Sequence, residues 1–380
     1  MRFLHTSDWQ LGMTRHYLEG EAQGRFAQAR VDAVVRAAEV ATERGCGFAV
    51  VAGDVFETSQ PDRRTVGRAL EALAAFTVPV YLLPGNHDPY DPGSVYRSAA
   101  FTDACPDHVE LLHDRTPRTP TAGVEVVGAP WTSKRPLTDL VSDTCAALAA
   151  DGTRRVVVGH GPVDVVVGDH DQAGLVRLAD LEATIADGRV GYVALGDRHS
   201  ALAVGDTGRI WYSGAPEPTG YREERPGRVL VVDLPDDVPE GSPLVEEVQV
   251  GSWHFHELAR SVDGDADLDL LLADLDAVDD KARAVVKLKV DGSLTLTQAA
   301  RMERALEARE DVFGALEHPE RHTDVVVVAD DADLDELRLT GYAAVARDRL
   351  RERAAGDGDD AEVATDALGL LVRLAGETTR

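Results

Sequence analysis

Short runs of apolar, mostly β-branched residues recur along the first half of the chain, and polar residues follow each run at once. Such runs predict buried strands, because a strand covered on both faces is apolar throughout. Between them, apolar positions at helical spacing predict helices at residues 25–44 and 62–73. This alternation of strands and helices is typical of a layered α/β fold. The five clearest strand runs lie at residues 2–6, 48–52, 78–83, 156–158 and 192–195.

The second half of the chain has a different pattern. A closing strand is predicted at residues 228–234, and a Pro/Asp/Gly-rich turn follows at residues 235–241. We therefore divide the chain into a main domain at residues 1–250, a smaller domain at 251–330 and a helical tail at 331–380. The elements predicted beyond residue 250 are a strand at 284–290 that ends at Asp291-Gly292, a helix at 296–309 capped by Thr295 or Thr297, a strand at 323–328, and helices at 334–353 and 364–375.

Each of the five strand runs is followed by residues of the types that commonly bind metal ions in proteins. Loops at the C-terminal ends of buried strands are free to carry polar chemistry, so we expect these residues to converge along one sheet edge. An ordered set of this size is what a site for two cations requires, because two cations need about ten ligand positions. The candidate ligands are Asp8, Gln10, Asp54, Asn86, His160, Asp197 and His199.

These motifs, taken in order, resemble a known family. Gly85-Asn86-His87-Asp88 after a strand is highly specific when Gly53-Asp54 lies upstream, whereas Gly-Asp alone is common. The chain resembles the calcineurin-like metallophosphoesterases, and within them the SbcD-type nuclease subunits of bacterial SbcCD complexes. The resemblance covers somewhat more than half of the chain, at residues 1–12, 53–57, 84–88, 128–131, 159–161, 192–199 and 212–216.

The resemblance implies a fold and an activity. The fold is a four-layer α/β/β/α sandwich with a smaller α+β capping domain and C-terminal helices. The activity is that of a two-metal DNA exo/endonuclease, which hydrolyses phosphodiester bonds at DNA ends or hairpins in the repair of double-strand breaks. By resemblance, Asp54 bridges the two ions; Asp8, Gln10 and His199 complete one ion, and Asn86, His160 and Asp197 complete the other.

The resemblance and the chemistry of the site also suggest roles for His87 and Asp88. His87 would stabilise the phosphoryl oxygens or protonate the leaving alkoxide. Asp88, its neighbour in the sequence, could orient that imidazole and raise its pKa.

Two positions depart from the family pattern, which has histidine where this chain has Gln10 and Asp197. Two imidazoles are replaced by an amide and a carboxylate, so the pocket is harder. We therefore expect Mn²⁺ or Mg²⁺ to be preferred over Zn²⁺, with Mn²⁺ first. The same departures are also compatible with a vacant first metal site and a scaffold without activity.

Composition fits a globular enzyme, with 44% hydrophobic and 28% charged residues. No apolar run approaches the length of a membrane span, and the chain enters its first motif strand directly, so neither a membrane anchor nor a signal peptide is expected. The three cysteines Cys46, Cys105 and Cys145 suit the reducing cytoplasm.

The charge conflicts with the simplest nuclease hypothesis. The net charge is −28, from 67 acidic and 39 basic residues, whereas a protein that grips DNA alone is expected to be basic. Either local basic groups contact the DNA, or a partner holds it. The resemblance implies an SMC-like ATPase partner of the SbcC type, and a homodimer is left open. The acidic charge also favours a second hypothesis, a phosphodiesterase or phosphatase for small phosphoesters. Candidate local groups are Arg15 with His16, Arg63 with Arg64 and Arg68, and Lys134 with Arg135.

Other chemically capable residues have plainer explanations. His5 lies inside a predicted strand and is expected to be a core histidine. Trp9, which follows that strand, is expected to be core or a wall of the site. His254 and His256 would share one strand face and could bind a metal, but without a third ligand nearby an ordinary strand is favoured.

Arg198 and the last predicted helix each allow two interpretations. Arg198 could contact a phosphate or form an ion pair with Asp197 or Asp206. An apolar stripe on the last helix could pack on its own domain or on the coiled coil of a partner; it consists of Leu368, Leu371, Val372 and Ala375.

Overall fold

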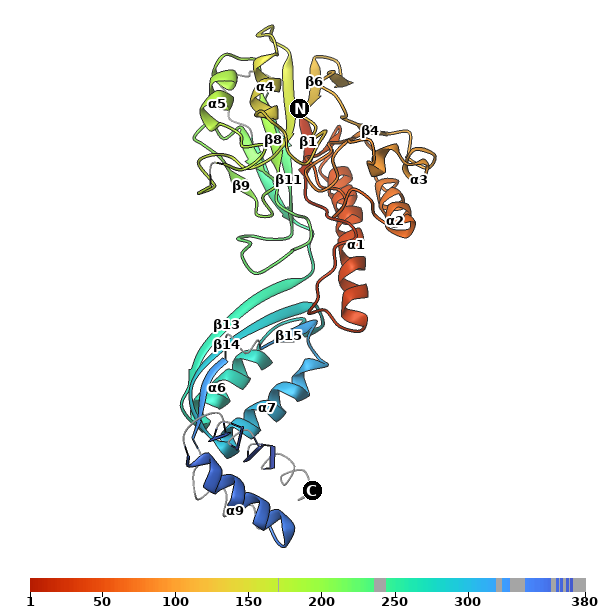
Figure 1. Ribbon diagram of the computed structural model, residues 1–380. Coiled ribbons are helices and arrows are strands. Elements are labelled where there is room, and N and C mark those ends of the chain that lie inside the picture. Colours follow the sequence, from red (N-terminus) through yellow and green to blue (C-terminus); the bar gives the residue numbers. More distant parts are fainter. Residues whose placement is uncertain are drawn as a thin grey trace. The chain divides into compact units, whose positions relative to one another are not determined.

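The structure is a computed structural model that describes residues 1–169, 171–235, 244–318, 323–328, 339–356, 360–361, 363–364, 367–368 and 370–371. The chain forms two compact units. The first consists of residues 1–16 and 23–253, and the second of residues 17–22 and 254–380. The sheets of the first unit use the strands β1 to β12, and the sheet of the second begins at β13 (Figure 1).

The first sheet of the first unit is parallel in its centre. Strands β1 to β4 run parallel to one another, β11 pairs antiparallel with β1, and β12 pairs antiparallel with β11. In spatial order its strands are β12 (Leu244–Gln249), β11 (Arg228–Asp233), β1 (Arg2–Thr6), β2 (Ala49–Val51), β3 (Val80–Leu82) and β4 (Val109–Leu111).

The second sheet repeats this arrangement. Strands β6, β7, β8 and β10 are parallel, and the edge strands β5 and β9 are antiparallel to their neighbours. In spatial order its strands are β5 (Arg118–Thr121), β6 (Val124–Gly128), β7 (Arg154–His160), β8 (Tyr192–Gly196), β10 (Ile210–Tyr212) and β9 (Leu202–Ala203).

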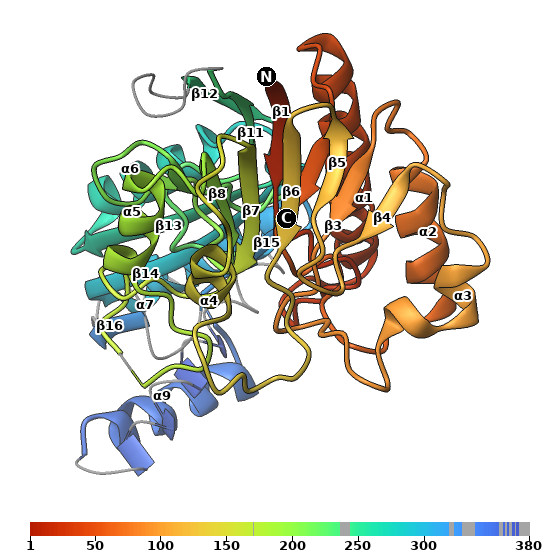
Figure 2. The same cartoon turned by 90° about the horizontal axis from the view of Figure 1, so that it is seen from above.

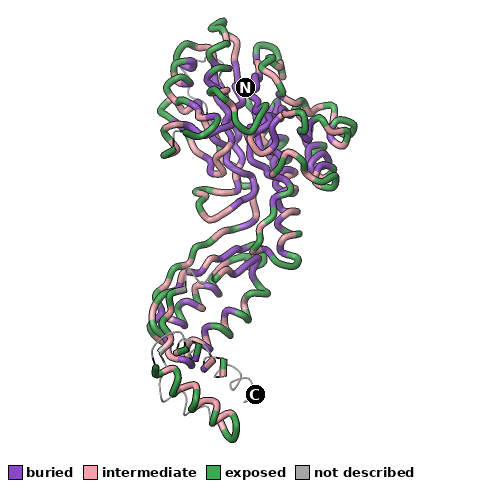
Figure 3. The backbone as a smooth tube through the Cα atoms, viewed as in Figure 1, coloured by how far each residue is buried: buried purple, intermediate pink, exposed green. Residues whose placement is uncertain are grey.

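Alternate residues of each strand build different layers, because successive side chains of a strand point to opposite faces. Phe3 and Val156 belong to the apolar core that joins the two sheets. Leu4 packs instead with helices on the outer face of the first sheet, and Val157 with helices on the outer face of the second. Buried residues accordingly follow the strands (Figure 3).

The helices form the two outer layers. Figure 2 shows α1 and α2 on one side of the paired sheets and α4 and α5 on the other. The four-layer α/β/β/α sandwich expected from the sequence is therefore confirmed. The helices of this unit are α1 (Glu21–Glu43), α2 (Arg63–Leu73), η1 (Val95–Arg97), α3 (Ala99–Thr102), α4 (Leu140–Ala146) and α5 (Leu178–Ala186).

The second unit is an α+β structure with its own apolar core. Strand β14 pairs in parallel with β13, β15 and β16. Thr295 caps α7 through a capping box with Gln298, which confirms one of the two predicted caps. The elements are β13 (His254–Val262), α6 (Asp265–Asp276), η2 (Lys281–Arg283), β14 (Ala284–Thr295), α7 (Leu296–Glu310), β15 (Ala315–Glu317), β16 (Thr323–Val328) and α9 (Tyr342–Ala354).

Two predicted boundaries were wrong. The strand expected to end at Asp291-Gly292 continues to Thr295, because Gly292 adopts φ +124° and pairs with both Val262 and Val325. The helix expected at residues 334–353 is not continuous, because residues 339–341 are not helical and α9 begins at Tyr342; residues 334–338 lie outside the described residues. The predicted turn at 236–241, His170, Val372 and Ala375 also lie outside them. A search of the described helices finds none that could cross a membrane.

Candidate metal centre

The residues predicted to bind metal lie where parallel strands of both sheets end. Asp8 follows β1, Asp54 follows β2 and Asn86 follows β3, all in the first sheet. In the second sheet, His160 is the last residue of β7, and Asp197 follows β8. The loops after β1 and β2 are held together by backbone hydrogen bonds, from Asp8 N to Gly53 O (3.0 Å) and from Gln10 N to Asp54 O (2.9 Å).

The backbone is strained at four of these residues. Asp8, Gln10, Asp54 and Asp197 adopt φ values of 53°, 44°, 54° and 101°, and only two other non-glycine residues among those described have positive φ. Left-handed conformations are unfavourable for residues with a Cβ and persist where the surrounding structure enforces them, often at functional sites. The strain therefore marks the same residues as the sequence motifs.

Glycines bring the loops close to the ligands. A Cβ at Gly85 would lie 2.2 Å from Asp54 Oδ1, and a Cβ at Gly53 would lie 2.2 Å from His160 Nδ1. No larger residue fits without moving those side chains. The glycines noted in the motifs thus allow the close packing of the centre.

His160 stands at the middle of one group of ligands. Its Nε2 lies 2.8 Å from Asn86 Oδ1, 3.4 Å from Asp54 Oδ2 and 3.8 Å from Asp197 Oδ1. Its Nδ1 lies 2.8 Å from Ala52 O, so the Nδ1 proton is donated to this carbonyl and Nε2 faces the carboxylates. One donor atom each from Asp8, Asp54 and His160 lie within 4.8 Å of one another.

A second group surrounds His199. Its Nε2 lies 3.1 Å from Gln10 Nε2 and 4.0 Å from Asp8 Oδ1. On the other side of the ring, Nδ1 lies 2.6 Å from Thr219 Oγ1 and 3.5 Å from Glu223 Oε1. The structure therefore brings all seven candidate ligands together in two adjoining groups, which are joined by Asp8, Asp54 and His160.

The buried carboxylates of the centre repel one another, and a positive charge among them would be stabilising. Burial raises the pKa of Asp8, and it raises the pKa of Asp197 to about 6. Burial alone would lower the pKa of His160, but Asp54, Asp8 and Asp197 outweigh it and raise that pKa well above its ordinary value. A cation would offset the same repulsion between carboxylates.

The donor set fits divalent cations. Besides the carboxylates, Gln10 Oε1 is buried and has no hydrogen-bond partner among the described residues, and such an atom is costly unless something binds it. Carboxylate and amide oxygens together with imidazole nitrogens are suitable ligands for Mn²⁺ and Mg²⁺. We conclude that the residues present fit a divalent metal centre.

His87 lies at the rim of the centre and is half-buried. Its backbone N donates to Asp54 Oδ1 (3.0 Å), and its Nδ1 lies 2.8 Å from Glu57 O. Because a carbonyl can only accept, Nδ1 carries the proton and Nε2 is left for a substrate.

The expected role of Asp88 was wrong. Its carboxylate does not orient His87 but accepts hydrogen bonds from Phe56 N (3.0 Å), Gly85 N (2.8 Å) and the Tyr96 hydroxyl (2.6 Å). Asp88 is fully buried, and burial raises its pKa to about 6. Asp88 therefore stabilises the loop that carries Asn86 and His87 through these hydrogen bonds, and not by acting on the imidazole.

Sequence reasoning missed the residues that support the ligands. Thr219 and Glu223 contact His199, although neither belongs to a motif typical of metal sites. Ser7 Oγ donates to Asp8 Oδ2 (2.6 Å) and lies 2.7 Å from Ser213 Oγ. Both serines lie within segments that carry the family resemblance, which was the one available signal for them.

Several of the plainer sequence explanations are confirmed. His5 is a buried core histidine whose Nε2 lies 3.2 Å from Leu195 O, and burial lowers its pKa to about 3. Trp9 packs in the core beneath the first sheet. In the part of the chain that the structure describes, Arg198 has no ion pair with Asp197 or Asp206, and its Nε is buried without a partner.

Comparisons with known proteins found relatives in sequence and in structure. The SbcD subunit of the nuclease SbcCD from Rhodobacter capsulatus is 28% identical over 358 residues, which cover 81% of this chain and 85% of that protein. The DNA double-strand break repair protein Mre11 of Archaeoglobus fulgidus is 37% identical over 91 residues, covering 23% of this chain and 19% of that protein.

A solved structure from Thermus thermophilus, TT1561, is similar with a TM-score of 0.41 and 12% identity, over 66% of this chain and 98% of that one. Residues 1–201, more than half of the chain, match the calcineurin-like phosphoesterases. The chain therefore belongs to the calcineurin-like phosphoesterase family and is a hydrolase of phosphoester bonds.

Proposed function

We propose that this protein is a DNA nuclease that hydrolyses phosphodiester bonds with two divalent cations and processes DNA ends in the cytoplasm. The observation that carries the proposal is the extent of similarity to the SbcD subunit of the Rhodobacter capsulatus nuclease. It covers 81% of this chain, whereas the match to the phosphoesterase family ends at residue 201. The relationship thus extends beyond the part that all phosphoesterases share. The free cysteines fit a reducing compartment.

The two groups of ligands support the use of two cations. Asp8, Gln10 and His199 would hold one ion, and Asn86, His160 and Asp197 the other. Asp54 would bridge them, because one of its carboxylate oxygens lies within 4.8 Å of ligand atoms of both Asp8 and His160. When bound, such ions polarise phosphoryl oxygens and lower the pKa of water. We propose Mn²⁺ as the first choice and Mg²⁺ as the second, because oxygen donors outnumber imidazoles here.

We propose His87 as the residue that acts on the substrate directly. The hydrogen bond from its Nδ1 to Glu57 O fixes the ring with Nε2 outward. In the protonated state, Nε2 would donate a hydrogen bond to a phosphoryl oxygen or a proton to the leaving alkoxide. The link from His87 N to Asp54 Oδ1 ties this ring to the proposed bridging ligand.

We propose an SMC-like ATPase of the SbcC type as a partner. The net charge of −28 disfavours unaided binding to DNA. Helix α9 has no buried residue, and it exposes Tyr342 and Val345 with relative accessibilities of 89% and 51%. Removal of the residues after Ala355 also removes Leu368, which is buried against Leu296 and Ala300 and packs with α9, so circular dichroism must first show that the shortened chain stays folded. Loss of co-purification with the ATPase would support binding through that segment, and persistent association would place the interface elsewhere.

The test of the activity is hydrolysis of end-labelled double-stranded and single-stranded DNA with Mn²⁺, with bis-p-nitrophenyl phosphate as a small diester. His87→Ala removes the proposed acid, and His113→Ala serves as a matched control because His113 is 43% exposed on another loop. We expect DNA cleavage by the native chain and by the control, and its loss in His87→Ala. DNA cleavage that persists in His87→Ala would contradict the role of His87.

The second candidate function is hydrolysis of small phosphoesters, which the acidic net charge favours. It shares the chemistry but requires no polymer groove. Hydrolysis of the small diester without DNA cleavage, even after addition of the ATPase, would favour this function. Failure on all three substrates with bound metal would favour a scaffold.

A further inference from the structure

A second cluster of metal-ligating residues lies in the second unit, outside the candidate metal centre. His254 and His256 stand two positions apart on β13, so their side chains share one face of the strand. Their ring centroids are 6.3 Å apart. Strand β13 pairs with β14 alone among the described strands and is therefore an edge of its sheet.

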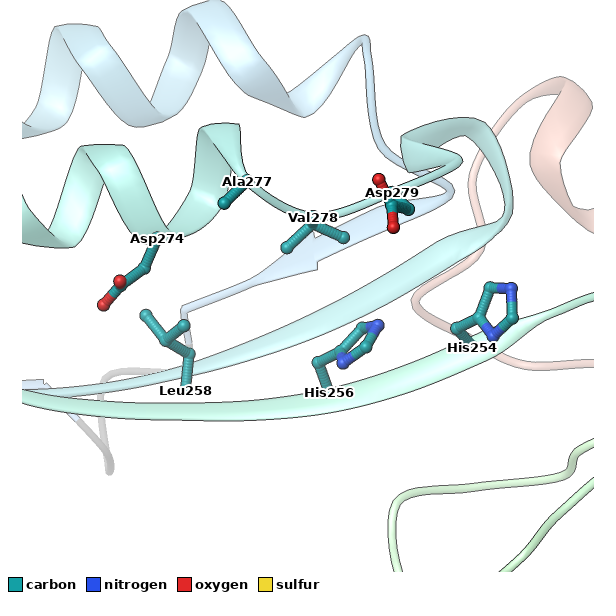
Figure 4. A pocket seen from close by; sticks show the side chains of 7 residues that line it. All are labelled: His254, His256, Leu258, Asp274, Ala277, Val278 and Asp279. Carbon is teal, nitrogen blue, oxygen red and sulfur yellow. The ribbon is translucent and has the colours of Figure 1, made fainter.

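The two imidazoles line a cavity of about 620 Å³ beneath the C-terminal end of α6. Leu258, Ala277 and Val278 form apolar parts of its wall. Figure 4 shows both rings rising from β13 toward the segment that follows α6, and the carboxylate of Asp279 projecting from that segment into the same space. Asp279 thus adds a potential third donor to the lining of this cavity.

The donors at this cavity are not engaged elsewhere. Among the described residues, no hydrogen bond or ion pair is formed by the side chains of His254, His256 or Asp279. Asp274, which also lines the cavity, is different because it forms an ion pair with Arg260. Asp279 is therefore the carboxylate that is free to bind an ion.

We propose that His254, His256 and Asp279 form a binding site for a transition-metal ion such as Zn²⁺. Two imidazoles and one carboxylate form a borderline donor set that favours Zn²⁺, Cu²⁺ or Ni²⁺ over Mg²⁺ and Ca²⁺.

The site differs from the candidate metal centre in how it would form. Asp8, Asp54 and His160 are already gathered within 4.8 Å, and no other described group meets that limit. His254, His256 and Asp279 are exposed, so their side chains can rotate to close on an ion. We accordingly expect binding to order these three side chains.

The test is equilibrium dialysis of the full chain against Zn²⁺ in excess Mn²⁺. The comparison is between the native chain, the double variant His254→Gln/His256→Gln, the variant Asp279→Asn, and the control His113→Gln. The double variant should bind one equivalent of Zn²⁺ less than the native chain and the control, and Asp279→Asn should weaken that equivalent by about tenfold or more. Circular dichroism would verify the fold, and hydrolysis supported by Mn²⁺ should be unchanged.

Equal Zn²⁺ stoichiometry in the double variant and the native chain would overturn the proposal. Native affinity in Asp279→Asn would remove Asp279 from the site and overturn the three-ligand assignment. Electron paramagnetic resonance with Cu²⁺ gives a second readout, because imidazole nitrogens split the signal. Loss of that splitting component in the double variant would support the site, and its persistence would oppose it.

Discussion

Thr219 Oγ1 lies 2.6 Å from Nδ1 of His199, on the side of the ring opposite to the candidate metal centre. The same hydroxyl donates to the carboxylate of Glu223 and therefore accepts from His199. This contact fixes the proton on Nδ1 and leaves Nε2 of His199 to face Gln10 and Asp8. A residue twenty positions away thus determines which nitrogen can bind an ion.

Thr219→Val should weaken metal binding at His199 without removing a ligand. Because the ring loses the partner that orients it, we expect the affinity for Mn²⁺ to fall by about 10–100-fold. Isothermal titration with Mn²⁺ would measure the change, and excess Mn²⁺ should restore most of the activity. Thr121→Val, on the exposed end of β5, is the matched control. Native Mn²⁺ affinity in Thr219→Val would show that the contact has no such role.

Gln10→His should change which metals support activity. Gln10 Oε1 is a buried oxygen for which the described part of the chain offers no hydrogen-bond partner, and an imidazole would replace this hard donor with a softer one. We expect the ratio of activity with Zn²⁺ to activity with Mn²⁺ to rise in the variant. The ratio is measured with the small diester at saturating metal. If it does not move, Gln10 does not set the metal preference.

Added Mn²⁺ should stabilise the native fold. An ion that binds only the folded state at a hundred times its Kd adds about 2.7 kcal/mol to the free energy of unfolding. Asp54→Asn removes the proposed bridging carboxylate and should lose most of the rise in Tm caused by Mn²⁺. Asp107→Asn, an exposed change, should keep it. A rise that is equal in all three proteins would indicate binding elsewhere.

His5 should make the stability depend on pH independently of any metal. Burial lowers its pKa in the folded state from 6.5 to about 3, so the unfolded chain binds a proton more readily. The free energy of unfolding should therefore fall as the pH drops below 6.5, by about 1.4 kcal/mol per pH unit from this group. His5→Gln should reduce that slope between pH 6 and pH 4, as measured by urea unfolding. An unchanged slope in the variant would mean that His5 is not the source.

The strands and the candidate ligands could be predicted because their signals are local. A short apolar run predicts a buried strand. A polar residue that follows the run then lies at the C-terminal end of that strand, so its position can be predicted from the local sequence. The adjacent residues Gly53-Asp54 and Gly85-Asn86 form short motifs that also predict ligand positions after a strand. Four strained residues at this edge show how tightly the loops are held.

Other features depend on contacts that no local pattern encodes. Asp88 lies beside His87 in the sequence, yet the hydrogen bonds to its carboxylate within the described residues come from Phe56, Gly85 and Tyr96. Asp291-Gly292 has the composition of a turn, but backbone pairing on both sides keeps it within β14. In both cases tertiary pairing outweighs the local signal.

The most direct test of the candidate metal centre is anomalous diffraction from crystals of the native chain soaked in Mn²⁺. The account predicts two adjacent peaks with Asp54 between them. Asp8, Gln10 and His199 should surround one peak, and Asn86, His160 and Asp197 the other. A single peak, or none beside Asp54, would contradict the two-metal assignment and favour a centre that Gln10 and Asp197 have disabled.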